Sequence, residues 1–155
     1  MTMSLSSPVT GGAQTGLTSP TYTLTGDVAP DNNGVQYAIT ALGGTQTGVD
    51  VSSVSSPFTV TLVRPKNFRT LPAVNPVTGA LSRVPRNTWK IITRKGVVPL
   101  SGQPAATMMV TTTIDVPTGG DTANPEDIRA ALSLHFGALS QASSDIGDSV
   151  INGTL

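Results

Sequence analysis

The sequence predicts an α+β fold, with an antiparallel β-sheet that includes an N-terminal hairpin and is followed by two C-terminal α-helices. Two observations predict the sheet. The 155 residues include 23 Thr and 15 Ser, together with 16 Gly and 12 Pro, a composition that favours strands and turns. As far as residue 116, short apolar segments alternate with polar residues at a period of two. Beyond Pro117 the apolar residues recur at helical spacing, which predicts the helices.

Five segments have the alternating pattern of strands. They are residues 21–25, 35–41, 58–62, 88–95 and 106–116. Because successive side chains of a strand point to opposite faces, each segment has one apolar face and one more polar face. The predicted apolar face holds Phe58, Val60, Leu62, Trp89, Ile91, Met108, Val110 and Ile114. The opposite face holds Thr59, Thr61, Lys90, Arg94, Thr107, Thr111 and Thr113.

The connections between these strands differ in character. Residues 42–56 are rich in Gly, Ser and Thr, and residues 66–87 include three prolines, which predicts an extended connection or ribbon. The length of the chain and the lack of an internal repeat predict a single domain over residues 1–155. Residues 21–116 are expected to form its sheet and residues 124–152 its helices, while residues 1–20 form either an arm or a first strand.

The first helix is predicted to begin at Asn124, whose side chain can cap free amides. Pro125 suits the first helical position, and the two acidic residues that follow complement the helix dipole. A second, short helix is predicted from residue 143 or 144 to Gly153. Two helices can cover only part of one sheet face, so another face and an edge stay open. A two-fold dimer that extends the sheet would satisfy that edge.

The net charge of zero conceals a strong polarity along the chain. Residues 51–114 contain eight basic side chains and no acidic one, whereas residues 1–50 contain three acidic side chains and no base. Residues 115–155 contain six acidic side chains against Arg129 alone. A basic middle segment folded onto one face attracts a polyanion. Lys90 and Arg94 are set among the threonines of the polar face. Hydroxyl groups and basic side chains can bond the phosphates, sugars and nucleobase edges of RNA, so this face is a candidate RNA-binding surface.

Several classes of function are not supported by the sequence. The chain has no Cys and a single His, His135, which excludes disulfides and thiol catalysis and leaves little for a metal site. His135 lies on the apolar side of the predicted helix, where a packed or interfacial role is expected rather than catalysis. The segment 10–12 lacks the Lys of a phosphate-binding loop, and no apolar run could span a membrane. We therefore expect neither an enzyme nor a cofactor, a small-molecule substrate or a membrane partner.

The order of these elements resembles the coat proteins of single-stranded RNA bacteriophages of the levivirus type. The resemblance covers essentially residues 21–155, and its motifs are short, so that its specificity comes from their order. The segments that carry it are the hairpin-like 21–25 followed by 31–35, the strands at 58–65, 86–90 and 111–116, and the helix pair at 124–152. The segments 66–87 and 42–56 depart from the family pattern in their length.

The resemblance implies a homodimer whose two sheets join edge to edge, with the helices of each subunit laid over the sheet of the other. Such dimers close into an icosahedral shell, commonly T=3, in which the sheet faces packaged single-stranded RNA. The loop at 97–105 would adapt its shape around the symmetry axes. The sheet of the family also binds a genomic RNA hairpin and represses translation of the replicase. Carried over to this chain, RNA binding would fall on Thr59, Thr61, Lys90, Arg94, Thr107, Thr111 and Thr113, with Arg64 and Lys66 nearby.

The resemblance also implies a place in the virion, with assembly in the cytoplasm of a bacterial host. Two other functions remain open from the sequence. The Thr, Ser and Gly content is compatible with a β-rich surface or fibre module that does not bind nucleic acid. The basic segment is compatible with an RNA-binding regulator that acts as a free dimer and does not assemble further.

Overall fold

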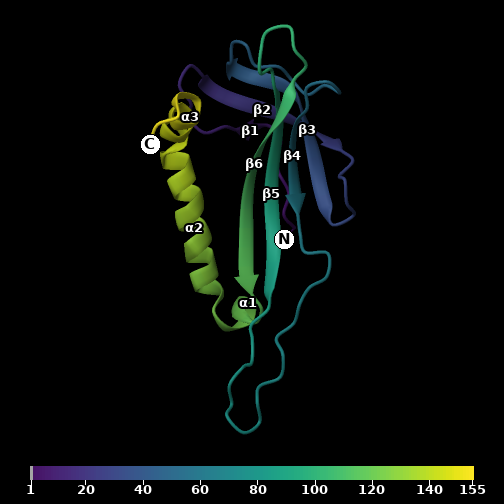
Figure 1. Cartoon of the computed structure of the whole chain (residues 1–155), viewed down its shortest axis with the longest axis vertical. Helices are drawn as coiled ribbons and strands as arrows, with labels where there is room; N and C mark the ends of the chain where they lie inside the picture. Colours follow the sequence, from purple (N-terminus) through teal and green to yellow (C-terminus); the bar gives the residue numbers. More distant parts are fainter. Residues whose placement is uncertain (1) are drawn as a thin grey trace.

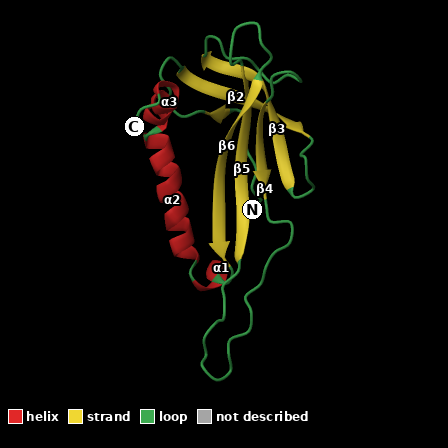
Figure 2. Cartoon of the chain, viewed as in Figure 1, coloured by secondary structure: helices red, strands yellow, loops and turns green. Residues whose placement is uncertain are grey.

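The computed structural model describes residues 2–155 and has six strands and three helices (Figure 1). The strands are β1 (Val9–Thr10), β2 (Thr18–Asp27), β3 (Gly34–Thr45), β4 (Phe58–Val63), β5 (Arg86–Val97) and β6 (Ala106–Pro117). The helices are α1 (Gly120–Ala123), α2 (Pro125–Gln141) and α3 (Ser143–Asn152). All strands precede all helices along the chain, which confirms the predicted α+β fold class (Figure 2).

The six strands form one antiparallel sheet in the order of the sequence, β1-β2-β3-β4-β5-β6. Each predicted strand is present, and most extend a few residues beyond the predicted ends, because ladder pairing continues where the alternation weakens. The longest ladder joins β5 to β6, with Arg86 opposite Pro117 and Val97 opposite Ala106. Strand β1 lies within residues 1–20, for which the sequence left an arm or a first strand open. Helix α1 was not predicted, because one helical turn is too short to show a period.

The buried core of the chain is small and lies at the middle of the sheet. Only Ile39 and Leu62 are buried apolar residues among residues 2–155, and both belong to the central strands β3 and β4. The N-terminal segment approaches the apolar face here: Leu5 and Val9 line a hollow together with Phe58 and other apolar residues of the sheet. Part of this face is thus covered by the N-terminal segment of the same chain.

The two long helices do not cover the sheet of their own chain, contrary to the simplest form of the prediction. Helix α2 runs beside the outer edge of β6, and α3 lies near the turn between β1 and β2 (Figure 1). Neither helix contains a buried residue. Helix α3 is held through the side chain of Gln14, which donates to the carbonyl of Ser143 at 2.7 Å, and through Thr15, which donates to Asp148 at 2.9 Å.

The predicted cap of α2 was wrong in its detail. Pro125 is the first residue of the helix, as expected, but the Asn124 side chain makes no hydrogen bond to a helix amide. Its amide group instead donates to the carboxylate of Asp127. The backbone of Asn124 ends α1, with its N–H bonded to the carbonyl of Gly120, so this residue joins the two helices without capping the amides of α2.

Candidate functional site

The free edge of β6 is the first surface that this fold leaves incomplete. Strand β6 pairs with β5 on one side and has no strand on the other. A cleft of about 400 Å³ separates this edge from α2. Ile114 and Val116 line it from the strand, and Ile128, Leu132 and His135 line it from the helix. An unpaired edge next to an apolar cleft offers main-chain hydrogen bonds and apolar contacts to an added strand.

Apolar side chains of the helices are the second incomplete feature. Ile128, Leu132, Phe136 and Leu139 follow one stripe of α2, and Phe136 and Leu139 are 42% and 40% exposed. The whole chain exposes 10707 Å². A compact monomer of its mass, 15.8 kDa, would expose roughly 7,300 Å². This excess, about half as much again, means that the chain by itself leaves much apolar surface in water.

The polar face of the sheet is the third surface, and the register brings its predicted residues together. Thr59 lies opposite Arg94, Lys90 lies opposite Thr113, and Thr107 lies opposite Gly96. By the alternation along each strand, all seven predicted sheet residues therefore share one face. We call this surface the threonine face, defined as Thr59, Thr61, Lys90, Arg94, Thr107, Thr111 and Thr113.

Two hydroxyls of the threonine face are less accessible than the sequence suggested. Thr61 is 2% exposed and Thr59 is also buried. The guanidinium of Arg94 donates to the Thr61 hydroxyl at 3.2 Å, and this hydroxyl donates to the Gln36 carbonyl oxygen at 2.9 Å. Thr61 thus orients Arg94 and has little surface of its own for a ligand. Lys90, Thr107, Thr111 and Thr113 are exposed, and Arg94 is half-buried.

The same hydrogen bonds continue to the outer part of the sheet. Gln36 donates through its amide to the carboxylate of Asp27 at 2.8 Å, so a polar chain runs from Arg94 on β5 to Asp27 on β2. The Gln36 amide and the backbone N–H of Val28 hold the pKa of Asp27 below its ordinary value. Asp27 is therefore a carboxylate at neutral pH, and it gives one end of this surface a negative charge.

Basic residues form a row along β5, and the sequence pattern predicts only part of this row. Arg86, Lys90 and Arg94 occupy every fourth position, hence one face, and successive members are roughly 13 Å apart along the strand at its usual rise. Arg86 was missed because the strand was predicted to begin at residue 88. Extending the alternation backwards by two residues would have found it. Lys95 lies on the opposite face, 4.9 Å from the centre of the Phe58 ring.

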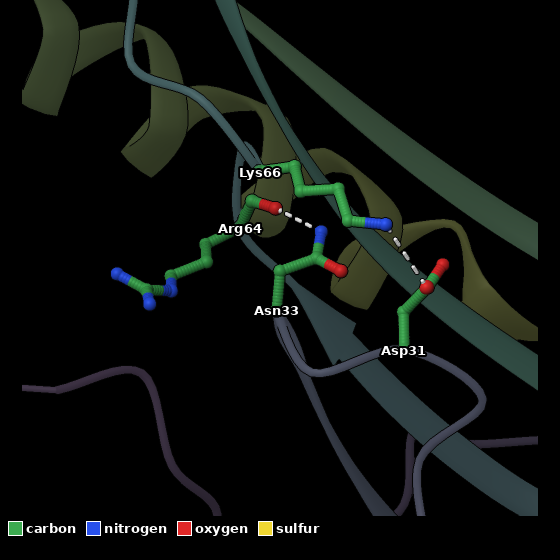
Figure 3. A network of polar contacts seen from close by, with 4 residues as sticks. All are labelled: Asp31, Asn33, Arg64 and Lys66. Carbon is green, nitrogen blue, oxygen red and sulfur yellow. Dashed lines mark hydrogen bonds and ion pairs between the residues drawn. The ribbon is translucent and has the colours of Figure 1, made fainter.

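Arg64 and Lys66 do not lie on the strands but follow the end of β4 (Figure 3). The Asn33 side chain donates to the carbonyl of Arg64 at 2.6 Å, and the Arg64 guanidinium points away from this contact. Lys66 pairs with the exposed carboxylate of Asp31 at 3.3 Å. The structure thus places both residues at the margin of the sheet, and Lys66 is already paired.

Within residues 2–155, no group of three or more His, Asp or Glu side chains could hold a metal ion. His135 stands in the cleft beside β6, with its ring 5.7 Å from that of Phe136. None of the helices in this part of the chain combines the length and apolar character needed to cross a bilayer.

Burial raises the pKa of the Tyr22 hydroxyl, which packs edge-on against Phe58 on the apolar face.

Comparison with known proteins decides between the possible families. No family model and no curated protein matches the chain. A solved structure, the virus-like particle of bacteriophage ESE020, does match, with 51% sequence identity and a TM-score of 0.96. The match covers 99% of this chain and 100% of the other. The chain belongs to the bacteriophage coat proteins.

Membership in this family accounts for the incomplete surfaces described above. A bacteriophage coat protein is a structural protein of the capsid, and its place is the virion. A subunit of a shell needs surfaces that are satisfied only by other subunits. The free edge of β6 and the uncovered stripe of α2 are features of that kind. The match covers nearly the whole chain, so the departures at 42–56 and 66–87 are not signs of another architecture.

Proposed function

We propose that this coat protein forms a homodimer in which the two β6 strands pair across a two-fold axis. The observation that carries the proposal is the free β6 edge beside the stripe of α2. An antiparallel partner strand entering the cleft would complete the edge and meet Ile128 and Leu132 of α2. The helix of each subunit would then lie over the sheet of the other. Pairing two such subunits buries apolar surface that the single chain exposes.

The dimers are proposed to assemble further into an icosahedral shell in the cytoplasm of the bacterial host. The related ESE020 protein was solved as a virus-like particle, which supports self-assembly for this chain as well. By the family resemblance, the shell would have T=3 symmetry, and the loop at 97–105, which joins β5 to β6, would adapt around its symmetry axes. Residues 98–104 of that loop are exposed, as such an adaptation requires.

We propose that the threonine face binds single-stranded RNA inside the shell. Lys90, Thr107, Thr111 and Thr113 are accessible and would contact phosphates and sugars. Thr59 and Thr61 would act by holding Arg94 and the middle of the sheet in place. We add Arg86 to these RNA-binding residues because it lies on the same face of β5 as Lys90 and Arg94. Arg64 and Lys66 would contribute at the margin of this face. An RNA hairpin that represses translation would bind the same face. Met109 on β6 is not aromatic, so this position would offer a nucleobase no aromatic ring to stack on.

Expression of the chain alone tests the proposal. We expect particles by electron microscopy, dimers after their dissociation, and nuclease-protected RNA in the purified product. A monomer that forms no particles at any salt concentration would overturn the assembly. Particles empty of RNA would favour a β-rich surface module instead, and RNA binding by a species that never exceeds dimer mass would favour a regulator.

A matched pair of charge reversals tests the RNA face. Lys90→Glu and Lys95→Glu change the charge by the same amount on one strand, but on opposite faces of the sheet. We expect Lys90→Glu to reduce the RNA content of the particles and the salt sensitivity of RNA binding, and Lys90→Glu with Arg94→Glu to reduce both further. Lys95→Glu should leave the RNA content near that of the unmodified protein. Equal losses in both single variants would contradict the assignment of the face.

A further inference from the structure

The connection between β4 and β5 is much longer than its geometry requires. Adjacent antiparallel strands can be joined by two to five residues, yet residues 64–85 separate this pair. The segment extends well past the end of the sheet and returns (Figure 1). We call residues 64–85 the arm. Loops of such length in compact domains are uncommon and usually functional.

The arm is fixed where it leaves the sheet. Asn33 and Arg64 are joined twice, because the Arg64 N–H donates to the Asn33 carbonyl at 3.0 Å and the Asn33 amide donates back to the Arg64 carbonyl (Figure 3). The ion pair of Lys66 with Asp31 lies at the same place. The first residues of the arm are therefore tied to the turn between β2 and β3.

The side chain of Asn87 holds the arm a few residues further on. It accepts a hydrogen bond from the Arg69 N–H at 2.8 Å and donates one to the Arg69 carbonyl at 3.1 Å. Phe68 packs near Trp89, with ring centres 5.9 Å apart. Because contacts from both flanking regions fix this part, the direction of the arm is set by the sheet.

The tip of the arm is a defined turn. The Asn75 side-chain oxygen accepts from the N–H groups of Val77 and Thr78 at 2.9 and 3.3 Å. The Gly79 N–H donates to the Asn75 carbonyl at 2.7 Å, and Gly79 has a φ of 69°, a conformation that glycine adopts without strain. Side chain and backbone of Asn75 thus order the residues farthest from the sheet.

Between its fixed base and its ordered tip, the arm presents apolar side chains to solvent. Val77 is 90% exposed, and Leu71, Val74, Leu81 and Val84 are also exposed. The arm includes Arg69 and Arg83 and no acidic residue. An apolar surface of this kind, on an ordered projection, is typical of a protein contact. Valine and leucine offer RNA neither hydrogen bonds nor stacking, so they do not favour RNA as the partner.

We propose that the arm docks on a neighbouring copy of this chain and joins one dimer to the next in the shell. The inference rests on the proposed assembly into a capsid. Arg69 lines a hollow together with Asp115 of its own chain, whereas Arg83 forms no ion pair among residues 2–155. Because all nine acidic residues of the chain lie outside residues 51–114, the arm has no carboxylate of its own for Arg83, and a second copy supplies one. The exposed valines and leucines provide the apolar contact, and the bases provide charge complementarity with the neighbour.

Removing the apolar surface of the arm tests this proposal. We expect Val74→Ser, Val77→Ser and Leu81→Ser in one variant to retain dimers of normal mass and far-ultraviolet circular dichroism while particle yield falls at least tenfold. The control variant, Val28→Ser with Val54→Ser, changes valines outside the arm that are more exposed than Val74 and Leu81, and it should assemble normally. Normal assembly of the arm variant would overturn the proposal. Failure of the unmodified protein to assemble would instead reject the proposed capsid function.

Cross-linking gives a second test that does not depend on a multiple substitution. Because the chain has no Cys, Val77→Cys provides a single position for a thiol-linked photoreactive group. In assembled particles we expect a covalent product of two chains, and in isolated dimers we expect none. Cross-links to RNA in place of protein, equal cross-linking in isolated dimers, or no chain-to-chain product in particles would each overturn the proposal.

Discussion

The middle of the sheet and the C-terminal helices differ in how much of their surface the single chain buries. Strand β4 is paired on both sides, and Thr59, Thr61 and Leu62 are buried there. Helix α2 is longer, yet none of its residues is buried. The β4 region reaches its final packing within one chain, whereas the apolar stripe of α2 faces the cleft beside β6 and stays partly exposed.

This difference separates two roles within one subunit. The sheet fixes the shape of the protomer through ladder pairing and the polar chain from Arg94 to Asp27. The helices and the free edge of β6 are the surfaces that we propose to contact other copies. Substitutions at β4 should therefore lower the stability of each protomer, and substitutions on the stripe of α2 should act mainly on association.

The largest effect is expected from charge on the stripe of α2. Phe136→Asp with Leu139→Asp should abolish dimers and particles, because each lost apolar contact costs about 1.5–3 kcal/mol. Each substitution should raise the dimer dissociation constant by on the order of tenfold to a hundredfold. Ala130→Asp lies on the opposite side of the same helix and is the control. Mass measurement in solution distinguishes the variants, and intact dimers in the double variant would refute the division of roles.

Truncation at the centre of the sheet should have the next largest effect. Leu62→Ala leaves a cavity between its cross-strand neighbours Val35 and Ile91 in a small core, and we expect the free energy of unfolding to fall by about 2–5 kcal/mol. Leu134→Ala is the matched change on α2, where the side chain is 75% exposed, and should change that value by less than about 0.5 kcal/mol within the protomer. Denaturant titration of both variants measures the difference. Similar losses would show that the helix is packed within the protomer after all.

A smaller effect is expected when the hydroxyl between Arg94 and Gln36 is removed. Thr61→Val keeps the shape of the side chain but deprives Arg94 of an acceptor and Gln36 of a donor, which should cost about 1–3 kcal/mol. Thermal unfolding reports this loss. RNA content should also fall if Thr61 positions Arg94, whereas a variant with reduced stability and unchanged RNA content would limit Thr61 to a structural role.

The smallest effect concerns pH. The pKa of Asp27 is lowered by its hydrogen bonds with Gln36 and Val28. The folded state therefore binds this proton less readily than the unfolded state, so the contribution to stability is present above the ordinary Asp pKa, near 3.8, and is lost as the pH falls below it. Asp27→Asn should flatten this part of the pH profile of the unfolding midpoint. If the unfolding midpoint of the variant falls at low pH as it does in the unmodified protein, carboxylates other than Asp27 cause the fall.

The strands could be predicted from the sequence because their signal is local. Period-two alternation is visible within each of β2 to β6, and it also gave the correct grouping of the threonine face, since parity along a strand determines which side chains point together. The start of α2 at Pro125 was equally local. The detail of the Asn124 cap failed because it depends on α1, a single turn that leaves no pattern.

Features that depend on distant parts of the chain, or on another copy, could not be predicted in this way. The burial of Thr61 follows from Gln36 and Arg94 on two neighbouring strands, which the alternation within β4 does not reveal. The position of the helices beside the sheet depends on contacts between distant residues, such as those of Gln14 with Ser143 and Thr15 with Asp148. The ordered arm depends on Asn33 and Asn87, two residues that appear in the sequence as ordinary turn and strand residues.

The large exposed surface of the single chain, 10707 Å², ties its stability to mass action. Where part of the native packing comes from a second copy, association stabilises the folded state relative to the unfolded state. The unfolding temperature therefore rises with protein concentration. Newly made subunits would be least stable when they are scarce and would gain stability as they accumulate. Assembly of such a chain would therefore begin when the concentration of subunits is high enough, without a separate trigger.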